Sequence, residues 1–506
     1  MKLSHILKEL TFEKIIEPIG FDPDMEVKSI HFDTRDVENG GLFVAVKGLI
    51  ADGHDYIEAA VEKGASVIIS EEEIKKEILK DSVLILSKNT RKSLSKVSDL
   101  FYGKPSEKLC LIGITGTNGK TTVTYMIESI LDRAGIKSGV IGTVNYRYNG
   151  KIFSNPRTTP ESCDLQRILS EMKDDGVTHV IMEVSSHALD LNRVDDARFD
   201  IAVFTNLSQD HLDFHSDMKS YFQSKKRLFN DLLQKSGKKT GAVINCIFDE
   251  GKEIYKELSE YDTFLISTGT TDGLKLYAES VEMNIDGIVC KIRSEKGDFD
   301  LKTSAVGKHN LENLLGAAGV GIMLNLPLKD IQKGMEEFVV PGRLQRVKEG
   351  RNVFVDYAHT PDALENVLLT LKNLCEGRLI TIFGCGGDRD KSKRPIMGKI
   401  ACKYSDISLI TSDNPRTEDP DAIIADIVEG VKESDARKID IDIDEINSLD
   451  KVYYIEADRK RSIEKGIKVS KQTDIVLIAG KGHENYQEIG KERFPFDDSI
   501  IAKDLM

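Results

Sequence analysis

The pattern of hydrophobic and polar positions predicts alternating strands and helices along most of the chain. Short apolar runs end in polar clusters and are followed, in several places, by apolar residues at helical spacing. The runs expected to form strands are residues 41–46, 65–70, 109–115, 179–184, 200–205, 242–245, 353–357, 379–383, 407–411 and 474–479. Such alternation is typical of an α/β fold with mostly parallel, doubly wound sheets, which bind ligands at the carboxyl ends of their strands.

Two breaks in this pattern divide the chain into three predicted domains. The loop at residues 103–105 follows a small α/β region, and the pattern restarts after residues 339–342. A length of 506 residues agrees with about three domains of roughly 150 residues each. We therefore expect a small N-terminal α/β domain at 1–105, a central doubly wound domain at 106–338 and a C-terminal domain at 339–506.

The segment GITGTNGKTT, residues 113–122, lies where a predicted strand passes into a predicted amphipathic helix. Glycines let backbone amides converge on an anion, and the amino end of the helix adds partial positive charge. Lys120 can reach the outer phosphates of a nucleotide, and the Thr121 hydroxyl is placed to bind magnesium. Ile114 stands where the general P-loop string has its leading glycine, so the loop is a variant. The alternative is a glycine-rich turn that binds nothing, but strand, loop, Gly-Lys-Thr and helix coincide here, which favours a nucleotide site.

Polar residues follow two further predicted strands. Glu183 lies near the carboxyl end of one, where a carboxylate can hold the magnesium that accompanies ATP; the alternative is a helix cap. The next strand runs into a turn with Asp210, His211, Asp213 and His215. A lone histidine is usually structural, but this density of His and Asp favours metal contact by His211.

A helix is expected at residues 221–229, with Tyr221, Leu228 and Phe229 turned inward and Lys225 near the metal edge. Most helical lysines are merely solvated, so periodicity alone assigns Lys225 no role. Its role depends on what else the sequence resembles.

Composition and charge set limits on function. A net charge of −14 argues against a nucleic-acid surface, and no uncharged apolar stretch approaches the length of a membrane span. Charged residues interrupt the apolar positions of residues 3–10, which predicts an amphipathic helix rather than a signal peptide. Seven cysteines without a CxxC pair suit a reducing cytoplasm, where we expect the protein to reside. Residues 432–450 are charge-rich and are expected to form a solvated surface segment.

Nine segments together make the sequence similar to the Mur ligase family of peptidoglycan synthesis over nearly the whole chain. They are TGTNGKTT, EVSSHALDLNRV (183–194), NLSQDHLDFH (206–215), SKKRLF, GRLQRV (342–347), DYAHTPD (356–362), GCGGDRDKSKRPIMG (384–398), DNPRTEDP (413–420) and GKGHENYQ (480–487). No single string is decisive, whereas their number, order and spacing are. Within the family, the sequence is most similar to members that add the third residue of the stem peptide. The resemblance implies a central P-loop ATPase domain and a Rossmann-like C-terminal domain.

The resemblance also implies an ATP-dependent, ADP-forming amide ligase. ATP would phosphorylate the D-glutamate side-chain carboxylate of UDP-MurNAc-L-Ala-D-Glu, and an amine would attack the acyl phosphate. The implied catalytic residues are Lys120, Glu183, His211 and Lys225; the implied ATP contacts are Gly116, Thr117, Asn118, Gly119, Lys120, Thr121, Thr122, Asn310, Asn313, Arg343 and Asp356. Asn310 and Asn313 have helix capping as their alternative. Arg343 and Asp356 would reach the nucleotide only if the third domain closes over the second.

Magnesium is the implied metal, with Thr121, Glu183, His211 and Lys225 as its site. In the family, a lysine at the position of Lys225 carries a carbamate formed from carbon dioxide. Carbamate formation needs a neutral amine, which costs about 4.6 kcal/mol at pH 7 from a reference pKa of about 10.4. A cation about 4 Å away returns roughly 4 kcal/mol per unit charge at an effective dielectric of about 20. Lys226 is the adjacent alternative, but Lys225 occupies the family position, four residues before Phe229.

The acceptor, UDP-MurNAc-L-Ala-D-Glu, is expected to bind the first two domains. The residues that match its site are Thr34, Leu49, Ile50, Ala51, Thr158, Thr159, Ser185 and Arg193. Asp33 and Arg35 are expected only to orient their loop. Arg157 and Leu191 depart from some family members, which have asparagine and glutamine there, and both are left unassigned.

The amino-acid substrate is expected to be meso-diaminopimelate. Arg416 of the DNPR string resembles the arginine that pairs with its distal carboxylate, which lysine lacks. The implied pocket consists of Arg389, Asp413, Asn414, Pro415, Arg416, Gly480 and Glu484, with Glu484 or Asp413 near the distal ammonium. The alternative for residues 413–415 is a simple Asx turn.

Several other functions remain open from the sequence. Three other enzymes share the chemistry: an L-lysine-adding Mur ligase, a different Mur ligase and a folylpolyglutamate synthetase. The DNPR string and the N-terminal segment that matches the UDP site, with Thr34 and residues 49–51, count against the last two. A P-loop switch protein without ligase activity is a fourth hypothesis, which predicts ATP turnover without an amine acceptor. We expect a monomer with no nucleic-acid partner and no membrane span.

Overall fold

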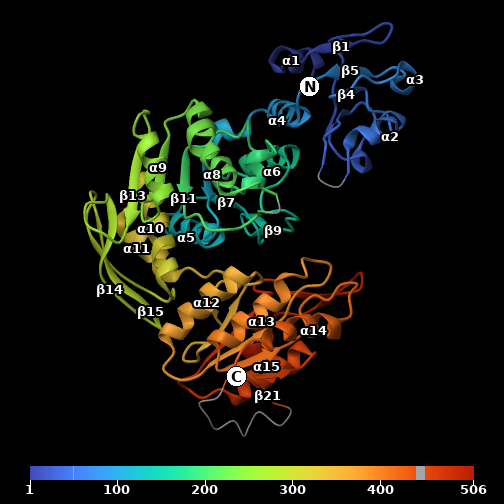
Figure 1. The fold of residues 1–506 in the computed structure, drawn as a ribbon. Coiled ribbons are helices and arrows are strands. Elements are labelled where there is room, and N and C mark those ends of the chain that lie inside the picture. Colours follow the sequence, from blue (N-terminus) through green and yellow to red (C-terminus); the bar gives the residue numbers. More distant parts are fainter. Residues whose placement is uncertain (49–50, 213, 440–450) are drawn as a thin grey trace. The chain divides into compact units, whose positions relative to one another are not determined.

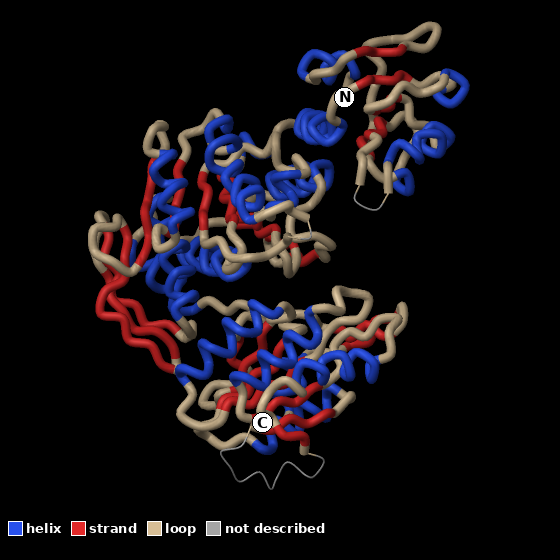
Figure 2. The backbone as a smooth tube through the Cα atoms, in the orientation of Figure 1, coloured by secondary structure: helices blue, strands red, loops and turns tan. Residues whose placement is uncertain are grey.

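The structure, a computed structural model, describes residues 1–48, 51–212, 214–439 and 451–506. The chain forms two compact units. The first consists of Met1–Glu279, Ile292–Phe299 and Glu312–Met335, and the second of Ser280–Lys291, Asp300–Leu311 and Glu336–Met506. Three large sheets with helices packed on them make up the fold (Figure 1), and strands and helices alternate along the chain (Figure 2). The predicted α/β fold class is confirmed.

A five-stranded sheet is formed by the amino-terminal part of the first unit. Its order is β1 (Lys14–Ile16), β5 (Val83–Leu86), β4 (Val67–Ser70), β3 (Leu42–Val44) and β2 (Ile30–His31), and only the β1–β5 pair among these is antiparallel. Apolar residues of alternate strand positions pack on α1 (Leu3–Glu9) and α4 (Thr90–Phe101) on one face, and on α2 (Ile57–Glu62) and α3 (Lys76–Leu79) on the other. The predicted amphipathic helix near the amino end is confirmed as α1.

An eleven-stranded sheet forms the centre of the fold. Its order is β16 (Phe299–Thr303), β15 (Gly287–Ser294), β14 (Leu276–Asn284), β13 (Phe264–Gly269), β12 (Gly241–Asn245), β11 (Ile201–Phe204), β6 (Cys110–Thr115), β10 (His179–Glu183), β7 (Ser138–Ile141), β8 (Tyr146–Tyr148) and β9 (Lys151–Phe153). The strands from β14 to β7 are parallel. After β6 the chain adds β7 and β10 on one side and β11 to β13 on the other, so β6 marks the switch point where such sheets bind ligands.

Helices cover both faces of the central sheet. One face packs on α6 (Ser162–Asp174), α7 (Ser186–Asp190), α8 (Met218–Arg227) and α9 (Asp249–Leu258). The opposite face is covered by α5 (Lys120–Arg133), α10 (Lys308–Met323) and α11 (Leu328–Glu337). Gly316 of α10, for example, lies against Val123 of α5 and Val203 of β11. Helix α8 continues directly into a π-helical turn, η4 (Leu228–Leu232), and 3-10 turns occur at η1 (Thr34–Asp36), η2 (Gly53–Tyr56), η3 (Pro105–Lys108) and η5 (Gln234–Ser236). The inward positions of Tyr221, Leu228 and Phe229 are confirmed.

A seven-stranded sheet forms the core of the second unit. Its order is β17 (Gln345–Arg346), β18 (Val353–Asp356), β23 (Ile475–Ala479), β19 (Leu379–Phe383), β20 (Ile407–Ile410), β22 (Val452–Ile455) and β21 (Arg437–Lys438). One face packs on α12 (Pro361–Leu374), α13 (Lys393–Tyr404) and α14 (Pro420–Val431), and the other on α15 (Arg459–Val469) and α16 (Asp498–Asp504). A separate hairpin consists of β24 (Tyr486–Ile489) and β25 (Glu492–Pro495).

The predicted strands are present, mostly shortened by one or two residues. Each predicted domain contains one large sheet, while the domain boundaries at 105 and 338 stay predictions. The prediction for residues 432–450 was incomplete, because Arg437–Lys438 form an edge strand beside β22; residues 440–450 lie outside the described part.

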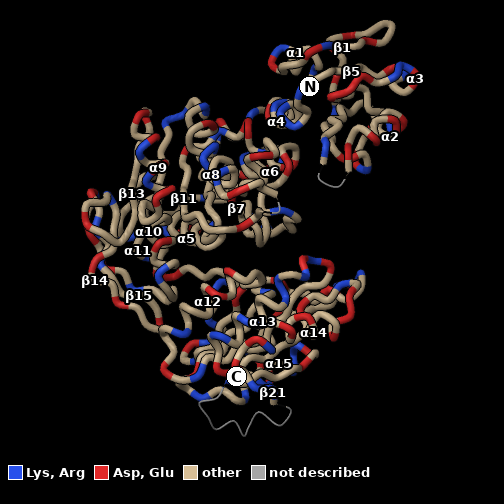
Figure 3. The backbone as a smooth tube through the Cα atoms, viewed as in Figure 1, with Lys and Arg blue, Asp and Glu red and all other residues tan. Residues whose placement is uncertain are grey.

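Charges of both signs alternate along the described chain (Figure 3). No helix among the described residues is long and apolar enough to cross a membrane. All seven cysteines are free thiols, and five of them are buried.

Candidate active site

The predicted nucleotide loop joins β6 to α5 at the switch point of the central sheet. Gly116 and Gly119 adopt φ angles of +147° and +86°, which side chains disfavour. A Cβ atom on Gly119 would lie 2.2 Å from Oδ1 of Asn313, and one on Gly116 would lie 1.9 Å from Oγ1 of Thr205. Only glycine fits these two positions, because any side chain there would collide with Asn313 or Thr205.

The loop is fastened to the segment that follows β11. The backbone nitrogens of Thr117 and Asn118 donate to the backbone oxygen and to Oδ1 of Asn206, at 3.0 and 2.9 Å, and Thr205 Oγ1 donates to the Asn118 oxygen at 2.6 Å. The sequence analysis missed Thr205 and Asn206. Their position at the end of the strand beside β6 is the signal that could have identified them.

Two lysines converge on one carbonyl of this loop. Lys120 Nζ donates to the oxygens of Gly116 and Thr117 at 2.9 and 2.8 Å. Lys225, on α8, donates from its Nζ to the same Gly116 oxygen at 2.8 Å. The structure therefore brings Lys225 to the nucleotide loop, as the sequence analysis expected.

Lys225 is almost completely enclosed, with 1% of its surface exposed. Burial, reinforced by the nearby Lys120 ammonium, holds the pKa of Lys225 well below its usual range. Its Nζ lies 4.3 Å from the ring centre of Tyr221, whose hydroxyl is 3.1 Å from Thr117 Oγ1. Lys226, the alternative, points elsewhere: it pairs with Glu253 and Glu257 at 2.8 and 2.7 Å. Of the two lysines, only Lys225 is placed to act on the loop.

Glu183 is the last residue of β10 and is 1% exposed. Its carboxylate accepts from Thr121 Oγ1 at 3.0 Å and from the backbone nitrogen and hydroxyl of Thr143, both at 2.9 Å. Glu183 caps no helix, because the cap of the following α7 is Ser185. A hydroxyl and a carboxylate side by side offer the hard oxygen ligands that magnesium prefers. Thr143 was missed by the sequence analysis.

His211 lies in the turn after β11 with a φ of +53°. Its ring is 4.9 Å from that of His187 and 6.1 Å from that of Tyr221. His215 is buried and contacts Ser186 Oγ at 3.0 Å, which is a structural role. Within the described residues, no three His, Cys, Asp or Glu side chains lie close enough together to hold a metal ion.

The predicted acceptor residues of the central sheet meet beside Glu183. Thr159 Oγ1 donates to the backbone carbonyl oxygen of Glu183 at 2.8 Å and accepts from the backbone nitrogen of Ser185 at 3.1 Å. Thr158 Oγ1 lies 3.1 Å from Thr143 Oγ1, and Arg193 Nη1 donates to the Thr159 oxygen at 3.2 Å. These contacts place Thr158, Thr159, Ser185 and Arg193 in one cluster.

The predicted UDP segment is only partly described. Leu49 and Ile50 lie outside the described residues. Ala51 is exposed, and its oxygen accepts from the Gly48 nitrogen at 2.9 Å. Thr34 begins η1, whose amino end is capped by Asp33, and the Asp33 carboxylate also pairs with Arg35. This agrees with the orienting role expected of Asp33 and Arg35.

Of the remaining predicted nucleotide contacts, Asn310, Asn313 and Asp356 are buried, whereas Arg343 is partly buried and lies 4.8 Å from the ring centre of Tyr357. Asn313 packs on Gly119 through its amide, as described above, and Asn310 Nδ2 donates to the Val306 oxygen at 2.9 Å. Asp356, in the second unit, accepts from the nitrogens of Leu344 and Ala358 at 2.7 and 2.8 Å, and burial raises its pKa.

The DNPR loop follows β20 at the carboxyl edge of the sheet in the second unit. Arg416 has a φ of +52°, and its Nη1 donates to the Gly387 oxygen at 2.7 Å while its Nε pairs with Glu488 at 2.9 Å. Asn414 Nδ2 donates to Glu484 Oε2 at 2.8 Å. Asp413 Oδ1 accepts only from the next residue's nitrogen among the described contacts, so a simple Asx turn does not describe this loop.

The structure brings most of the predicted amino-acid pocket together. Gly480 lies against Asp413, because a Cβ atom on it would be 2.5 Å from Oδ2, and Gly386 of the neighbouring loop lies between Arg389 and Arg416. Lys481, which is fully buried, donates from Nζ to Asn414 Oδ1 at 3.0 Å and to Glu484 at 3.2 Å. Lys481 and Glu488 were missed, although both lie in or next to the GKGHENYQ string.

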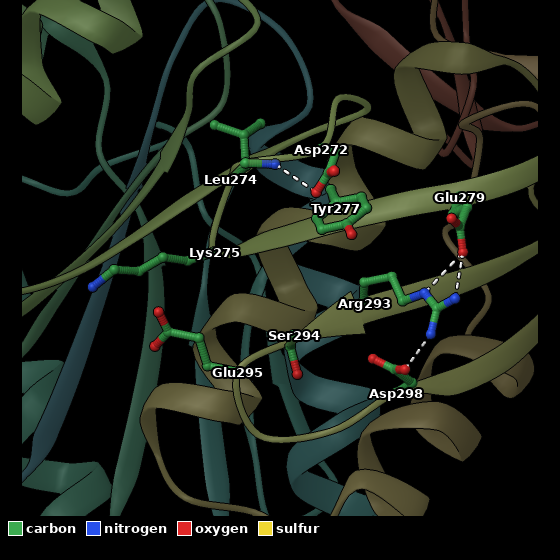
Figure 4. A pocket seen from close by; sticks show the side chains of 10 residues that line it. Asp272, Leu274, Lys275, Tyr277, Glu279, Arg293, Ser294, Glu295 and Asp298 are labelled. Carbon is green, nitrogen blue, oxygen red and sulfur yellow. Dashed lines mark hydrogen bonds and ion pairs between the residues drawn. The ribbon is translucent and has the colours of Figure 1, made fainter.

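A separate pocket lies among β14, β15 and their loops, and none of the predicted site residues lines it. It has a volume of about 500 Å³ and is lined by Asp272, Gly273, Leu274, Lys275, Tyr277, Glu279, Arg293, Ser294, Glu295 and Asp298. Figure 4 shows Arg293 between Glu279 and Asp298, with which it forms ion pairs. Because these charges satisfy one another, the pocket offers no evident reactive group.

The strand, glycine loop and helix around Lys120 define a P-loop nucleotide-binding protein. The chain matches three family descriptions: "Mur ligase family, catalytic domain" at residues 26–102, "Mur ligase middle domain" at 114–321 and "Mur ligase, glutamate ligase domain" at 342–482. The protein therefore belongs to the Mur ligase family.

Individual relatives agree over the full length. A UDP-N-acetylmuramoyl-L-alanyl-D-glutamate--2,6-diaminopimelate ligase of Geobacter sulfurreducens is 44% identical over 497 residues, which are 96% of each chain. A solved structure of an enzyme with that name has a TM-score of 0.70 at 30% identity and covers 100% of this chain and 98% of its own. MurF ligase of Thermotoga maritima, solved in complex with ADP, shares the fold with a TM-score of 0.59 at 20% identity, covering 90% of this chain and 94% of its own.

Proposed function

We propose that the protein is an ATP-dependent ligase that joins meso-diaminopimelate to the D-glutamate side chain of UDP-MurNAc-L-Ala-D-Glu in peptidoglycan precursor synthesis. The observation that carries this proposal is the 44% identity, over 96% of both chains, to a relative of that name. Two features of the structure support it. Lys120 and Lys225 meet at the nucleotide loop, where phosphate would bind, and Arg416 offers a guanidinium group that can bind a carboxylate.

The reaction proceeds in two steps. A carboxylate is a poor electrophile, so the side-chain carboxylate of D-glutamate first attacks the terminal phosphorus of ATP, which forms an acyl phosphate and releases ADP. The amine of diaminopimelate then attacks the acyl carbon, the amide forms, and phosphate leaves with loss of a proton. Lys120 and the loop amides stabilise the negative charge that develops on the phosphoryl oxygens. Asn310 and Asn313 hold the adenine side of the nucleotide in this proposal, and Arg343 and Asp356 reach it only when the C-terminal domain closes over the central one.

The metal site of the proposal consists of Thr121, Glu183, His211 and a carbamate on Lys225. The neighbouring hydroxyl and carboxylate of Thr121 and Glu183 fit magnesium, which supplies charge neutralisation for phosphoryl transfer when it is bound. The low pKa of Lys225 supports the carbamate, because the folded protein already disfavours the ammonium form that cannot react with carbon dioxide. The enclosed position of Lys225 also keeps competing nucleophiles away.

The acceptor and the amino acid bind at three sets of residues. Thr34 and residues 49–51 hold the UDP group, and Thr158, Thr159, Ser185 and Arg193 hold the dipeptide. The diaminopimelate pocket consists of Arg389, Asp413, Asn414, Pro415, Arg416, Gly480 and Glu484. The protein acts as a cytoplasmic monomer with the three domains 1–105, 106–338 and 339–506.

A coupled assay tests the function. Phosphate release should require both UDP-MurNAc-L-Ala-D-Glu and meso-diaminopimelate, and the product should gain the mass of one diaminopimelate residue. A lysine-adding enzyme would use L-lysine at least as well, and a P-loop switch protein would release phosphate without either substrate. Either of these results would contradict the proposal.

A further inference from the structure

A fully buried lysine contacts two residues of the proposed amino-acid pocket. Lys481 is 0% exposed and follows Gly480, just after the carboxyl end of β23. Lysine is almost never fully buried unless a partner offsets its charge. Nζ of Lys481 lies 3.2 Å from Oε2 of Glu484 and donates to Oδ1 of Asn414 at 3.0 Å. Because both partners belong to the proposed pocket, the charge of Lys481 acts on that pocket.

The contacts of Asn414 fix the orientation of its amide group. Oδ1 of Asn414 accepts from Lys481 Nζ at 3.0 Å and from the backbone nitrogen of Glu488 at 2.9 Å. Nδ2 of Asn414 can only donate, and it faces an acceptor, Oε2 of Glu484, at 2.8 Å. Asn414 is 2% exposed, so water competes little for these bonds. Lys481, Asn414 and Glu484 thus form a closed ring of three contacts.

This ring engages one of the two carboxylate oxygens of Glu484. Oε2 receives the donors of both Lys481 and Asn414, whereas Oε1 makes no hydrogen bond with any residue that the structure describes. The Glu484 side chain is 18% exposed, so a ligand can reach the carboxylate. A carboxylate that two donors hold at one oxygen presents the other oxygen in a fixed direction. Such an oxygen suits an ammonium group, with which it can form a charge-assisted hydrogen bond.

Asp413, the other carboxylate expected near the distal ammonium of diaminopimelate, is engaged at both oxygens. Its Oδ1 accepts from the backbone nitrogen of Asn414 at 2.7 Å. Its Oδ2 lies 3.9 Å from Nη1 of Arg459, a guanidinium group that is fully buried. Of the two carboxylates, Glu484 is therefore the one with an oxygen left for a cationic ligand.

We propose that Lys481 is a positioning residue for the choice of the amino acid: together with Asn414, it holds Glu484 so that Oε1 receives the distal ammonium of the substrate. Lys481 itself does not touch the substrate and acts only through its two partners. This inference rests on the proposed function, since it assigns the ligand to the amino acid of that reaction. It adds a residue that supports recognition of the ammonium group, whereas Arg416 serves the distal carboxylate.

Two amino acids that differ only at the distal centre test this role. The full-length protein and its K481M variant are assayed with meso-diaminopimelate and with L-2-aminopimelate, which keeps the reacting amine and the distal carboxylate but lacks the distal ammonium. K481M keeps most of the side-chain length and removes the charge and the donors. It should raise the KM for diaminopimelate about tenfold, as expected for a weakened contact between charged groups, and change kcat less. The KM for L-2-aminopimelate should stay nearly the same.

K372M is the matched control. Lys372, on α12, also pairs with a carboxylate of the second unit, since its Nζ lies 2.8 Å from Oδ2 of Asp406. Asp406 directly precedes β20, whereas the DNPR loop follows β20, so this pair lies at the opposite edge of the sheet. K372M should keep the KM values of the original protein for both amino acids.

The two KM values together decide whether Lys481 acts through the ammonium group. An equal rise in both values, or no change in either, would overturn the proposal. K481Q keeps a donor without the charge, so it should recover part of the affinity for diaminopimelate, and it gives the same comparison if K481M does not fold. If neither variant folds, Lys481 serves the fold and the proposal is wrong. Failure of the original protein to use diaminopimelate would instead overturn the proposed function.

Discussion

Nζ of Lys225 donates a hydrogen bond to the Gly116 carbonyl oxygen at 2.8 Å, and Lys120 donates to the same oxygen at 2.9 Å. Burial destabilises the charged form of Lys225, and two ammonium groups that share one acceptor also repel each other. The pKa of Lys225 is therefore held well below its usual range. The surroundings of Lys225 thus shift its amine toward the neutral form. This shift favours the carbamate that we propose, since carbon dioxide reacts with the neutral amine.

The carbamate that we propose on Lys225 would make ligase activity depend on bicarbonate. We expect activity to fall in buffers stripped of carbon dioxide and to recover when bicarbonate is added. K225R, which cannot form a stable carbamate, should lose about 10- to 100-fold in kcat and its response to bicarbonate, as for removal of a group that orients a metal site. K226R should keep both, because Lys226 pairs with Glu253 and Glu257 instead. A bicarbonate response that persists in K225R would exclude Lys225 as the modified residue.

The nucleotide loop tolerates no side chain at Gly119. G119A should weaken ADP binding at least about tenfold, because the added Cβ would lie 2.2 Å from Asn313 Oδ1 and the φ of +86° would be strained. G150A is the control: Gly150 has a φ of +77° but no atom within 4 Å of the added Cβ. It should cost only about 1 kcal/mol of stability and leave ADP binding unchanged by calorimetry. Equal effects of both variants would assign the loss to backbone strain alone.

Arg416 should determine the choice between diaminopimelate and lysine. R416A removes the guanidinium group that we propose pairs with the distal carboxylate, so it should raise the KM for diaminopimelate about 10- to 100-fold and leave the KM for L-lysine unchanged. The ratio of kcat/KM values for the two amino acids is the quantity to measure. A variant that loses activity with both amino acids equally would show that Arg416 serves the fold instead.

Glu488 should assist Arg416 by orienting its guanidinium group. E488Q keeps the size of the side chain and removes the charge, so we expect a few-fold rise in the KM for diaminopimelate with unchanged KM values for ATP and the acceptor. E492Q, on the partner strand of the same hairpin, is a matched surface change. Steady-state kinetics with each substrate varied in turn would distinguish the two variants.

Asp99 should make stability fall as pH rises from about 3.8 to about 6. Its side chain is fully buried against Arg198 at 3.1 Å, and burial outweighs this arginine and raises the pKa of Asp99 to about 6. Between the ordinary pKa of about 3.8 and 6, the folded state binds more protons than the unfolded state, so the free energy of unfolding decreases as pH rises through this window. The stability of the original protein minus that of D99N should therefore be larger at pH 5 than at pH 7 in urea denaturation. A difference that grows with pH would mean that Arg198 dominates.

Much of the fold could be predicted because buried parallel strands are continuous apolar runs, as in β6, β10 and β19. Strands that were not predicted include the short β8 and β9, the long β14 to β16 and the buried β5, β7 and β13. In β15, buried positions such as Ile288 and Cys290 alternate with more exposed ones such as Val289, so this strand lacks the continuous apolar run of a fully buried strand.

Parts of the candidate site could be predicted in two ways. Lys120 lies in a short motif whose chemistry is understood, and Lys225 and Arg416 match positions of the family's motifs. The partners of these residues could not be predicted, because they come from distant parts of the chain. Thr143 and Glu488 contact Glu183 and Arg416 only through the contacts that folding creates.

The hairpin of β24 and β25 holds the DNPR loop by several bonds: Gln487 Nε2 reaches the Asp413 oxygen, the Glu488 nitrogen reaches Asn414 Oδ1, and the backbones of Arg416 and Glu488 pair. A short ribbon thus holds in place the loop that we propose selects the amino acid. Changes in this ribbon would therefore alter the choice of the incoming building block, and with it the cross-linking chemistry of the cell wall.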